Sequence, residues 1–245
     1  MIKRHLFIEQ FLKRFFQIKI SLSFLLASIT LFVSVNSFAL NQYAKQWFAV
    51  NLQHALDKNK KWHSFLYSQL RTIDRTHPLE SGLLEGGIGY QLTADENIWI
   101  GYRWTGKNPY NDFYQENRVF QQIISQKQLG LYRFILRTRL EEITRSDTRQ
   151  IALRLRERLA IDGHRQLWRN TSLFAYDEVF FQLNHPAFIT SAFLGENRLF
   201  LGFNIRISKE TWWEIGYINQ YQVRTPQQNQ NQMSHILSIT YNFLD

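Results

Sequence analysis

The chain has 245 residues, a formal net charge of +9, 16% aromatic residues and no cysteine. A chain without cysteine is not a disulfide scaffold, and it cannot use thiol chemistry or a cysteine metal site. Its arginines alternate with apolar residues instead of gathering in solvated clusters, which argues against nucleic acid as a partner.

Residues 1–39 have the features of a secretory signal peptide. A basic segment ends at Lys19, the apolar run "ISLSFLLASITLFVSV" follows, and the small residues Ser37 and Ala39 close the stretch. This order is typical of exported chains. We expect cleavage after Ala39 and a single exported domain over residues 40–245; an uncleaved membrane anchor is the alternative.

After Ala39, no apolar stretch reaches the roughly 18 to 20 residues of a membrane helix. Instead, eleven segments alternate polar and apolar residues with the two-residue period of a β-strand. In chain order they are "WFAVNLQHAL", "WHSFLYSQLR", "LLEGGIGYQL", "NIWIGYRW", "YQENRVFQQII", residues 131–143, residues 150–161, "QLWRNTSLFAYDEVFF", and residues 198–207, 213–223 and 237–243. The pattern predicts an all-β chain.

The clearest pair of segments is 131–143 and 150–161. In the second, Arg154, Arg156 and Arg158 alternate with leucine and isoleucine, and the first carries Arg137 and Arg139 in the same way. The short link "TRSDTR" between them predicts an antiparallel hairpin with its two charged faces side by side.

Alternation alone does not say which face lies inside. The segments of about 10 to 13 residues are long enough to cross a bilayer at a tilt, whereas strands of soluble proteins average about 5 to 6. Six tryptophans lie near segment ends, as an interfacial girdle requires: Trp47, Trp62, Trp104, Trp168, Trp212 and Trp213. We therefore predict an antiparallel up-and-down transmembrane β-barrel of about 10–12 strands in the outer membrane, monomeric by default.

In such a barrel the polar face lines the lumen. The predicted lumen carries a charge network of both signs: Arg71, Glu85, Arg103, Glu116, Arg118, Arg137, Arg139, Glu141, Arg154, Arg156, Arg158, Glu178, Arg198, Arg206 and Glu214. Glu157 falls on the lipid face. We therefore expect either that it lies near a rim of the barrel or that a β-bulge turns its side chain to the other face of the strand.

Loop lengths give an orientation. The breaks near 57–61, 93–97, 126–130, 162–165 and 208–211 are short and should be periplasmic, whereas the other set is mostly longer and should be extracellular. Asp245 is then periplasmic, and residues 224–233 form a flexible extracellular loop.

Bacterial barrels have even strand numbers, so eleven suggests either an extra short strand within 40–56 or a first segment that lies in the lumen.

The layout "YSQLR", "GIGYQL", "GYRW", "ENRVFQQ", "LRTRLEE", "LRLRERL", "YDEVFF", "ENRLFLGF" and "HILSITYNF" resembles the domain of unknown function 2490 family of Gram-negative bacteria. The resemblance covers most of the chain after residue 39. It implies an exported, outer-membrane β-barrel-like protein without an assigned reaction, and it transfers no catalytic residue.

We expect a structural or envelope-transport role rather than an enzyme. A barrel lipid hydrolase would need a serine and a histidine within reach, but Ser64 with His63 and Ser234 with His235 are adjacent pairs that point to opposite faces of a strand. No histidine pair has metal-ligand spacing on one face, and we expect no metal or other cofactor.

The arginine face allows two interpretations, a narrow porin-like pore that prefers anions and a closed network of ion pairs. A third possibility is binding of anionic lipid or a protein partner through the long loops. The runner-up is an exported soluble β-barrel that binds an apolar ligand. The expected partners are outer-membrane lipid and, during insertion, the barrel-assembly machinery; protein partners cannot be named from the sequence.

Overall fold

The computed structural model describes residues 41–73, 79–108, 113–163, 170–190, 192–223 and 231–245, all within one compact unit. The predicted signal peptide lies outside the described residues. Every regular element is a strand: β1 (Asn41–Ala55), β2 (Trp62–Ile73), β3 (Leu79–Gln91), β4 (Glu96–Lys107), β5 (Tyr114–Leu129), β6 (Tyr132–Arg145), β7 (Ile151–Gly163), β8 (Thr171–Gln182), β9 (Leu194–Arg206), β10 (Thr211–Gln222) and β11 (Gln232–Leu244). In the same residues, no helix is long and apolar enough to span a membrane.

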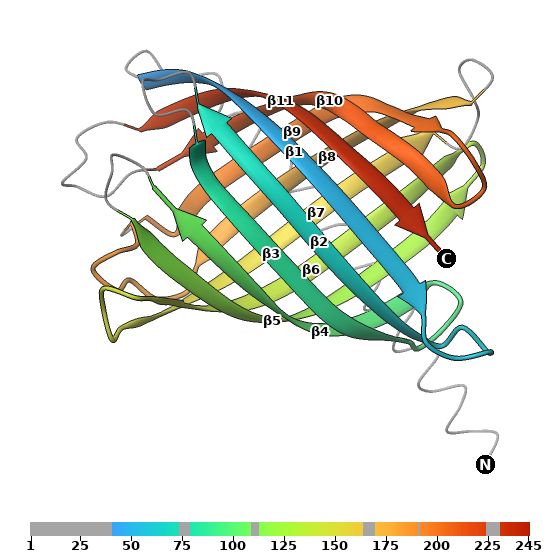
Figure 1. The fold of residues 1–245 in the computed structure, drawn as a ribbon, viewed down its shortest axis with the longest axis horizontal. Helices are drawn as coiled ribbons and strands as arrows, with labels where there is room; N and C mark the ends of the chain where they lie inside the picture. The colour runs from blue at the N-terminus through green and yellow to red at the C-terminus, as the bar shows by residue number, and fades with distance from the viewer. Residues whose placement is uncertain (1–40, 74–78, 109–112, 164–169, 191, 224–230) are drawn as a thin grey trace. The chain divides into compact units, whose positions relative to one another are not determined.

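The strands form one closed barrel in which each strand pairs with its neighbours in the chain (Figure 1). Consecutive strands are antiparallel, but β1 and β11 close the ring as a parallel pair, from Asn41 opposite Gln232 to Gln53 opposite Leu244. The all-β barrel is confirmed. The expectation of an even strand number is wrong for the described part of the chain, because residues 41–55 form one strand of the wall.

The parallel pair follows from the odd number. Antiparallel neighbours alternate in direction around a ring, so an eleventh strand must run parallel to the first. Odd strand numbers also occur in membrane barrels, since a mitochondrial channel has nineteen strands.

The connections alternate between the two ends of the barrel. The short-loop end carries 56–61, 92–95, 130–131, 164–170 and 207–210, together with Asp245, and lies at the right of Figure 1. The long-loop end carries 74–78, 108–113, 146–150, 183–193 and 223–231. The assignment of connections to the two ends matches the prediction, but their lengths differ less than predicted, because 56–61 and 164–170 are longer than 74–78 and 146–150. The predicted loop 224–233 also runs too far, because β11 begins at Gln232.

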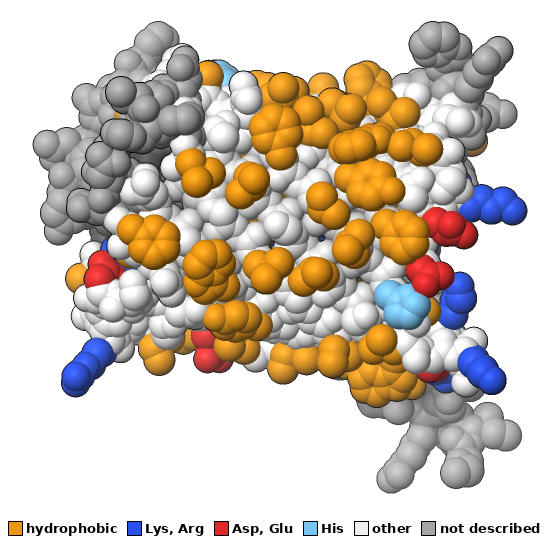
Figure 2. Space-filling model, viewed as in Figure 1, with side chains coloured by type: hydrophobic (Ala, Val, Ile, Leu, Met, Phe, Trp, Pro, Cys, Tyr) orange, Lys and Arg blue, Asp and Glu red, His pale blue; other side chains and the backbone are white. Residues whose placement is uncertain are grey.

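The outer wall is apolar over its middle. Large hydrophobic side chains are exposed there on most of the described strands, and Figure 2 shows them across the visible face, with lysine and arginine at its two ends. We call the following residues the outer apolar belt: Phe48, Val50, Leu52, Leu66, Leu70, Leu84, Ile88, Ile98, Ile100, Val119, Ile123, Ile161, Leu173, Leu199, Leu201, Phe203, Tyr217 and Leu237. The usual arrangement of a water-soluble protein is therefore inverted.

Glycines on the inner face make room for large rings on the next strand. Gly89 is paired with Trp99, and Gly101 is paired with Phe120. A Cβ added at Gly89 would lie 2.3 Å from the Trp99 ring, and one at Gly101 would lie 2.3 Å from the Phe120 ring. The glycine-rich segment "LLEGGIGYQL" is thus a strand whose missing side chains admit bulky neighbours.

The first testable consequence concerns Gly89. Gly89→Ala should lower the free energy of unfolding by about 1–3 kcal/mol, because the added methyl group overpacks against Trp99. The measurement is urea unfolding of the protein folded in detergent micelles. Gly86→Ala on the same strand is the matched control, since its Cβ would meet nothing closer than 3.5 Å. Equal losses in the two variants would contradict the packing explanation.

Trp47 is not part of an interfacial girdle, contrary to expectation. It is 4% exposed and packs inside the barrel with Phe174, Phe200 and Ile218. The alternation of side chains along β1 explains this position. Phe48 and Val50 face outward, so Trp47 and Ala49 face inward. Trp62 and Trp104 are exposed near strand ends, while Trp168 lies outside the described residues.

Glu157 faces outward near the middle of β7, so both expectations for it are wrong. The register of β7 with β6 and β8 runs through this position without a bulge, and Glu157 is paired with Thr138 and Val179. The Thr138 hydroxyl donates a hydrogen bond to Oε2 of Glu157 at 2.9 Å. The neighbouring strand therefore supplies a polar partner on an otherwise apolar surface.

Candidate functional site

The inner wall of the barrel holds a network of arginines and glutamates. Strand alternation places it there: Arg154, Arg156 and Ala160 of β7 are buried, whereas Ile151 and Ile161 are exposed. β6 has the same pattern, since Arg139 and Glu141 are buried and Glu142 is exposed. The two charged faces are adjacent in the wall, as the hairpin prediction required, with Arg139 paired to Arg156 and Glu141 to Arg154.

Glu141 is the most enclosed carboxylate of the network, with no exposed surface. Arg156 donates to its Oε1 at 2.6 Å, and Arg154 donates to its Oε2 through Nε at 2.9 Å and through a second, shorter contact. Arg139 and Arg118 lie farther away, with nitrogen to oxygen distances of 3.7 and 3.9 Å. One carboxylate thus bonds to two guanidinium groups and lies near two more, so its single negative charge offsets only part of their positive charge.

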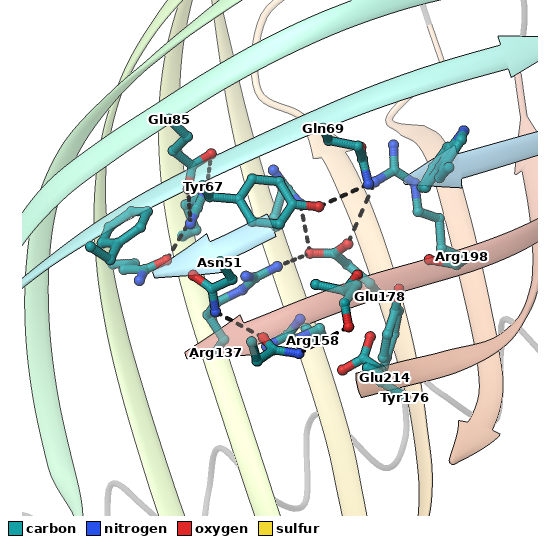
Figure 3. A pocket seen from close by; sticks show the side chains of 18 of the residues that line it. Asn51, Tyr67, Gln69, Glu85, Arg137, Arg158, Tyr176, Glu178, Arg198 and Glu214 are labelled. Carbon is teal, nitrogen blue, oxygen red and sulfur yellow. Dashed lines mark hydrogen bonds and ion pairs between the residues drawn. The ribbon is translucent and has the colours of Figure 1, made fainter. Parts of the chain in front are cut away.

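Two further carboxylates connect Glu141 to the rest of the wall. Arg156 also donates to Glu178 at 2.9 Å, and Arg137 forms an ion pair with the same oxygen. Glu85 accepts from Arg139 through both oxygens, at 2.9 and 3.2 Å, and pairs with Arg103. The contacts of Arg137 with Glu178 and of Arg139 with Glu85 join strands that are not neighbours, whereas the other two join adjacent strands. Figure 3 shows the carboxylate of Glu178 among its partners.

Aromatic rings support the guanidinium groups. The ring of Phe180, which is 1% exposed, has Arg156 and Arg198 at 4.6 Å and Arg154 at 5.1 Å from its centroid. Arg139 lies 3.9 Å from the centroid of Phe120. Cations above ring faces gain from the ring quadrupole, and the rings exclude water from one side of each charge.

A second group of charges lies toward the long-loop end. Glu116 accepts from Lys107 at 2.6 Å and from Arg118 at 2.5 Å. Glu196 accepts from Nε of Arg198 at 2.5 Å and from the amide of Gln220 at 2.6 Å. These pairs line the approach from that end to the central network.

The lumen contains two cavities on either side of the network. One, of about 320 Å³, is lined by residues of the middle and of the short-loop half, including Glu85, Arg158 and Glu214. The other, of about 370 Å³, lies toward the long-loop end and is lined by Lys107, Glu116 and Arg154 among others. Four arginines line both cavities. We call them the arginine septum: Arg71, Arg103, Arg156 and Arg198.

Both cavities have more positive than negative side chains in their walls. The long-loop cavity is lined by seven arginines and one lysine against Glu116 and Glu196. The other is lined by seven arginines against Glu85, Glu178 and Glu214. Within the described ranges, Arg71 and Arg158 form no ion pair with a carboxylate. The ion pairs therefore neutralise the positive side chains that line the two cavities only in part.

The β8–β9 connection covers part of the opening at the long-loop end. Phe188, Ile189 and Thr190 line the long-loop cavity, and the guanidinium of Arg145 lies 5.3 Å from the centroid of Phe188. Asn184 holds the start of this loop, because its side chain accepts from the backbone of Leu153 and donates to that of Ile151. This loop narrows the entrance.

The structure places fourteen of the fifteen predicted network residues inside the barrel. The exception is Arg206, which is exposed at the end of β9 and lines neither cavity. Prediction from the sequence missed Lys107 and Glu196, although each lies two residues from an inward-facing residue, Thr105 and Arg198, and the alternation was sufficient to find them. It also missed Trp47 as a lining residue.

Ser234 and His235 face opposite sides of β11, as expected for neighbours on a strand. Ser234 is fully buried, whereas Nδ1 of His235 bonds to the hydroxyl of Tyr217, a residue whose side chain is exposed on the outside. In the described residues, no group of three or more His, Asp or Glu side chains is placed to hold a metal ion.

The family model described as "Protein of unknown function (DUF2490)" matches residues 44–232. The chain belongs to the DUF2490 family. The match runs from β1 into the first residue of β11, so it includes every strand that contributes to the arginine and glutamate network. The resemblance seen in the short sequence motifs is confirmed.

One relative of this DUF2490 protein is an uncharacterised protein of Methylorubrum extorquens, 29% identical over 167 residues, which are 66% of this chain and 71% of the relative. Among solved structures, the siderophore receptor PirA from Pseudomonas aeruginosa is 13% identical, with a TM-score of 0.26. That alignment covers 69% of this chain but only 35% of the receptor, so the chain spans about a third of the receptor's length.

Proposed function

We propose that this DUF2490 protein is an outer-membrane β-barrel that admits small anions into its lumen, with the arginine septum as the constriction between an extracellular and a periplasmic cavity. The observation that carries this proposal is the inversion of the wall: apolar side chains are exposed outside, and paired charges are buried inside. The long-loop end would be extracellular and the short-loop end periplasmic.

The outer apolar belt supports location in a bilayer. Its strands have 12 to 16 residues, and roughly 9 to 11 are enough to cross the hydrocarbon core at a tilt. A closed ring satisfies every strand edge, which is the condition for a sheet in lipid. In water, the same belt would be an exposed apolar surface around the whole molecule, which soluble monomers rarely tolerate.

The charges of the lumen support a preference for anions. Rings of arginine in a pore raise the local concentration of anions and repel cations. The ion pairs of Arg156 with Glu141 and Glu178 hold the inward-facing side chains of three consecutive strands together, and Arg139 reaches Glu85 three strands away. These side chains keep the passage narrow. A narrow, partly neutralised passage suits small anions better than large solutes.

The runner-up, an exported soluble barrel with an apolar ligand, has less support. Such a protein needs apolar side chains around an enclosed cavity, yet charged side chains dominate both cavities of the lumen. The barrel lipid hydrolase has no observation in its favour.

The deciding experiment is single-channel recording in planar bilayers. We expect the wild type to give small steps with a higher permeability for chloride than for potassium. Arg156→Gln should raise the conductance and lower the anion preference, because it removes the bridge between Glu141 and Glu178 together with one positive charge. Arg133→Gln is the control, since Arg133 pairs with Asp162 near the short-loop rim and its side chain is 41% exposed.

Only inserted protein with heat-modifiable migration in gels would be recorded, so that a folding defect of Arg156→Gln is not mistaken for closure. A preference for cations, or no conductance in any variant, would contradict passage of anions while leaving the membrane location intact. Failure of the wild type to insert would contradict the membrane location itself.

A further inference from the structure

Two arginines converge on one indole at the boundary between the cavities. The guanidinium carbon of Arg71 lies 4.3 Å from the centroid of the Trp47 ring, and that of Arg198 lies 5.0 Å from it. Trp47 and Arg71 are paired neighbours on β1 and β2. Arg198 comes from β9, which two strands separate from β1. The fold thus brings two cations from separate parts of the wall to one ring.

Among the described residues, Arg71 is held in place by a hydrogen bond and not by an ion pair. Its Nε donates to the side-chain oxygen of Gln69 at 2.7 Å, and Gln69 in turn donates to the hydroxyl of Tyr67 at 2.8 Å, the contact drawn in Figure 3. In the part of the chain that the structure describes, no carboxylate pairs with Arg71. Its terminal nitrogens make no hydrogen bond there either, and Arg71 lines both cavities.

Arg198 is only partly neutralised. Its Nε donates to Glu196 at 2.5 Å, and its Nη1 lies 3.9 Å from Glu178. Glu178 is already shared with Arg137 and Arg156. Arg198 and Arg71 therefore carry excess positive charge into a space from which the Trp47 ring displaces water.

Two like charges in a medium less polar than water repel each other, and an anion that contacts both would offset this repulsion. Guanidinium groups present two parallel N–H donors, which match pairs of oxygens on phosphate or carboxylate. A group with several oxygens and two negative charges has enough acceptors and enough charge for two guanidinium groups. Chloride satisfies neither fork in this way.

We propose that Arg71 and Arg198, supported by Trp47, form a binding site for a phosphate group. The group is carried by inorganic phosphate or by a small phosphate monoester. The cavities of about 320 and 370 Å³ on the two sides leave room for the remainder of a monoester. The site deepens the proposed function and rests on it only for a role in transport, because the binding itself needs no membrane.

The test is titration calorimetry of the folded protein in detergent micelles, with potassium chloride at physiological strength. The probes are inorganic phosphate and glycerol 3-phosphate. Arg71→Gln should weaken the binding of both by about tenfold or more, since it removes one charged fork. Arg71→Lys keeps the charge without the fork and should bind with intermediate affinity.

Arg158→Gln is the matched control. Arg158 likewise lacks a carboxylate partner among the described residues, but it lies over Tyr176 at 5.3 Å and lines only one cavity. Unchanged affinity in this control together with a loss in Arg71→Gln supports the site. Equal losses in the two variants would indicate general attraction to the lumen and would overturn it.

Absence of phosphate binding to the wild type would also overturn the site, even where bilayer recordings show an anion preference. Binding with the expected pattern, but without conductance, would support the site and contradict passage of anions. If glycerol 3-phosphate binds and inorganic phosphate does not, the ligand is the ester; the reverse result assigns the site to the free ion.

Discussion

Glu141→Ala is expected to lower the free energy of unfolding by about 3–5 kcal/mol, the cost of removing one partner from a buried ion pair. Glu141 is fully buried and accepts from both Arg154 and Arg156, so its loss leaves two guanidinium groups inside the barrel without their shared acceptor. Glu141→Gln keeps an acceptor for one of them and should lose less. The measurement is urea unfolding in micelles, followed by tryptophan fluorescence and by heat-modifiable migration.

Glu142→Ala is the natural control, because Glu142 is the same residue type one position later and is exposed on the outer wall. Its substitution should leave the stability nearly unchanged. Removing one partner of a buried ion pair is costly because it leaves the other charge without compensation. A Glu141→Ala variant as stable as Glu142→Ala would therefore show that the network reorganises, and that Glu141 is not its centre.

The sequence was sufficient to assign most residues to a face of the wall. Because side chains alternate strictly along a strand, placing Arg156 inside also placed Arg154 inside and Leu155 outside. The composition of the network followed from this single rule. The set of loops at each end could be predicted in the same way. Consecutive antiparallel strands run in opposite directions, so every second connection lies at the same end of the barrel.

The partners across the lumen were beyond prediction. Glu85 and Arg139 lie on β3 and β6, and their meeting depends on barrel closure and strand tilt, which the alternation does not specify. The parallel pair of β1 and β11 was missed because bacterial barrels usually have even strand numbers, a regularity that is not a physical requirement. The prediction for Trp47 was wrong because it rested on the position of this residue near a segment end. The alternation of side chains along β1 instead turns Trp47 into the barrel.

The proposed phosphate site illustrates the same limit. The alternation predicts Arg71 as a lining residue, but nothing in the sequence indicates that Arg198 reaches the same indole or that Arg71 forms no ion pair with the described carboxylates. Both facts depend on which side chains the closed ring brings together. Electrostatic balance is thus a property of the folded lumen and cannot be read from the count of charges.

Leu201→Arg should separate a membrane barrel from a water-soluble one. Leu201 is 58% exposed at the middle of β9, within the outer apolar belt. At the midplane of a bilayer an arginine on the lipid face costs roughly 2–4 kcal/mol, and near an interface it costs about 0–1 kcal/mol. We therefore expect a loss of about 2–4 kcal/mol for the protein folded into phospholipid vesicles.

Ile207→Arg provides the matched control, because Ile207 is 59% exposed just after the end of β9, at the short-loop rim. In water the two substitutions would be equivalent, since each exchanges one exposed apolar side chain for a charged one. In lipid only the variant at mid-strand places its charge among acyl chains. A large loss for Leu201→Arg beside a small one for Ile207→Arg would support the membrane location, and equal small effects would contradict it.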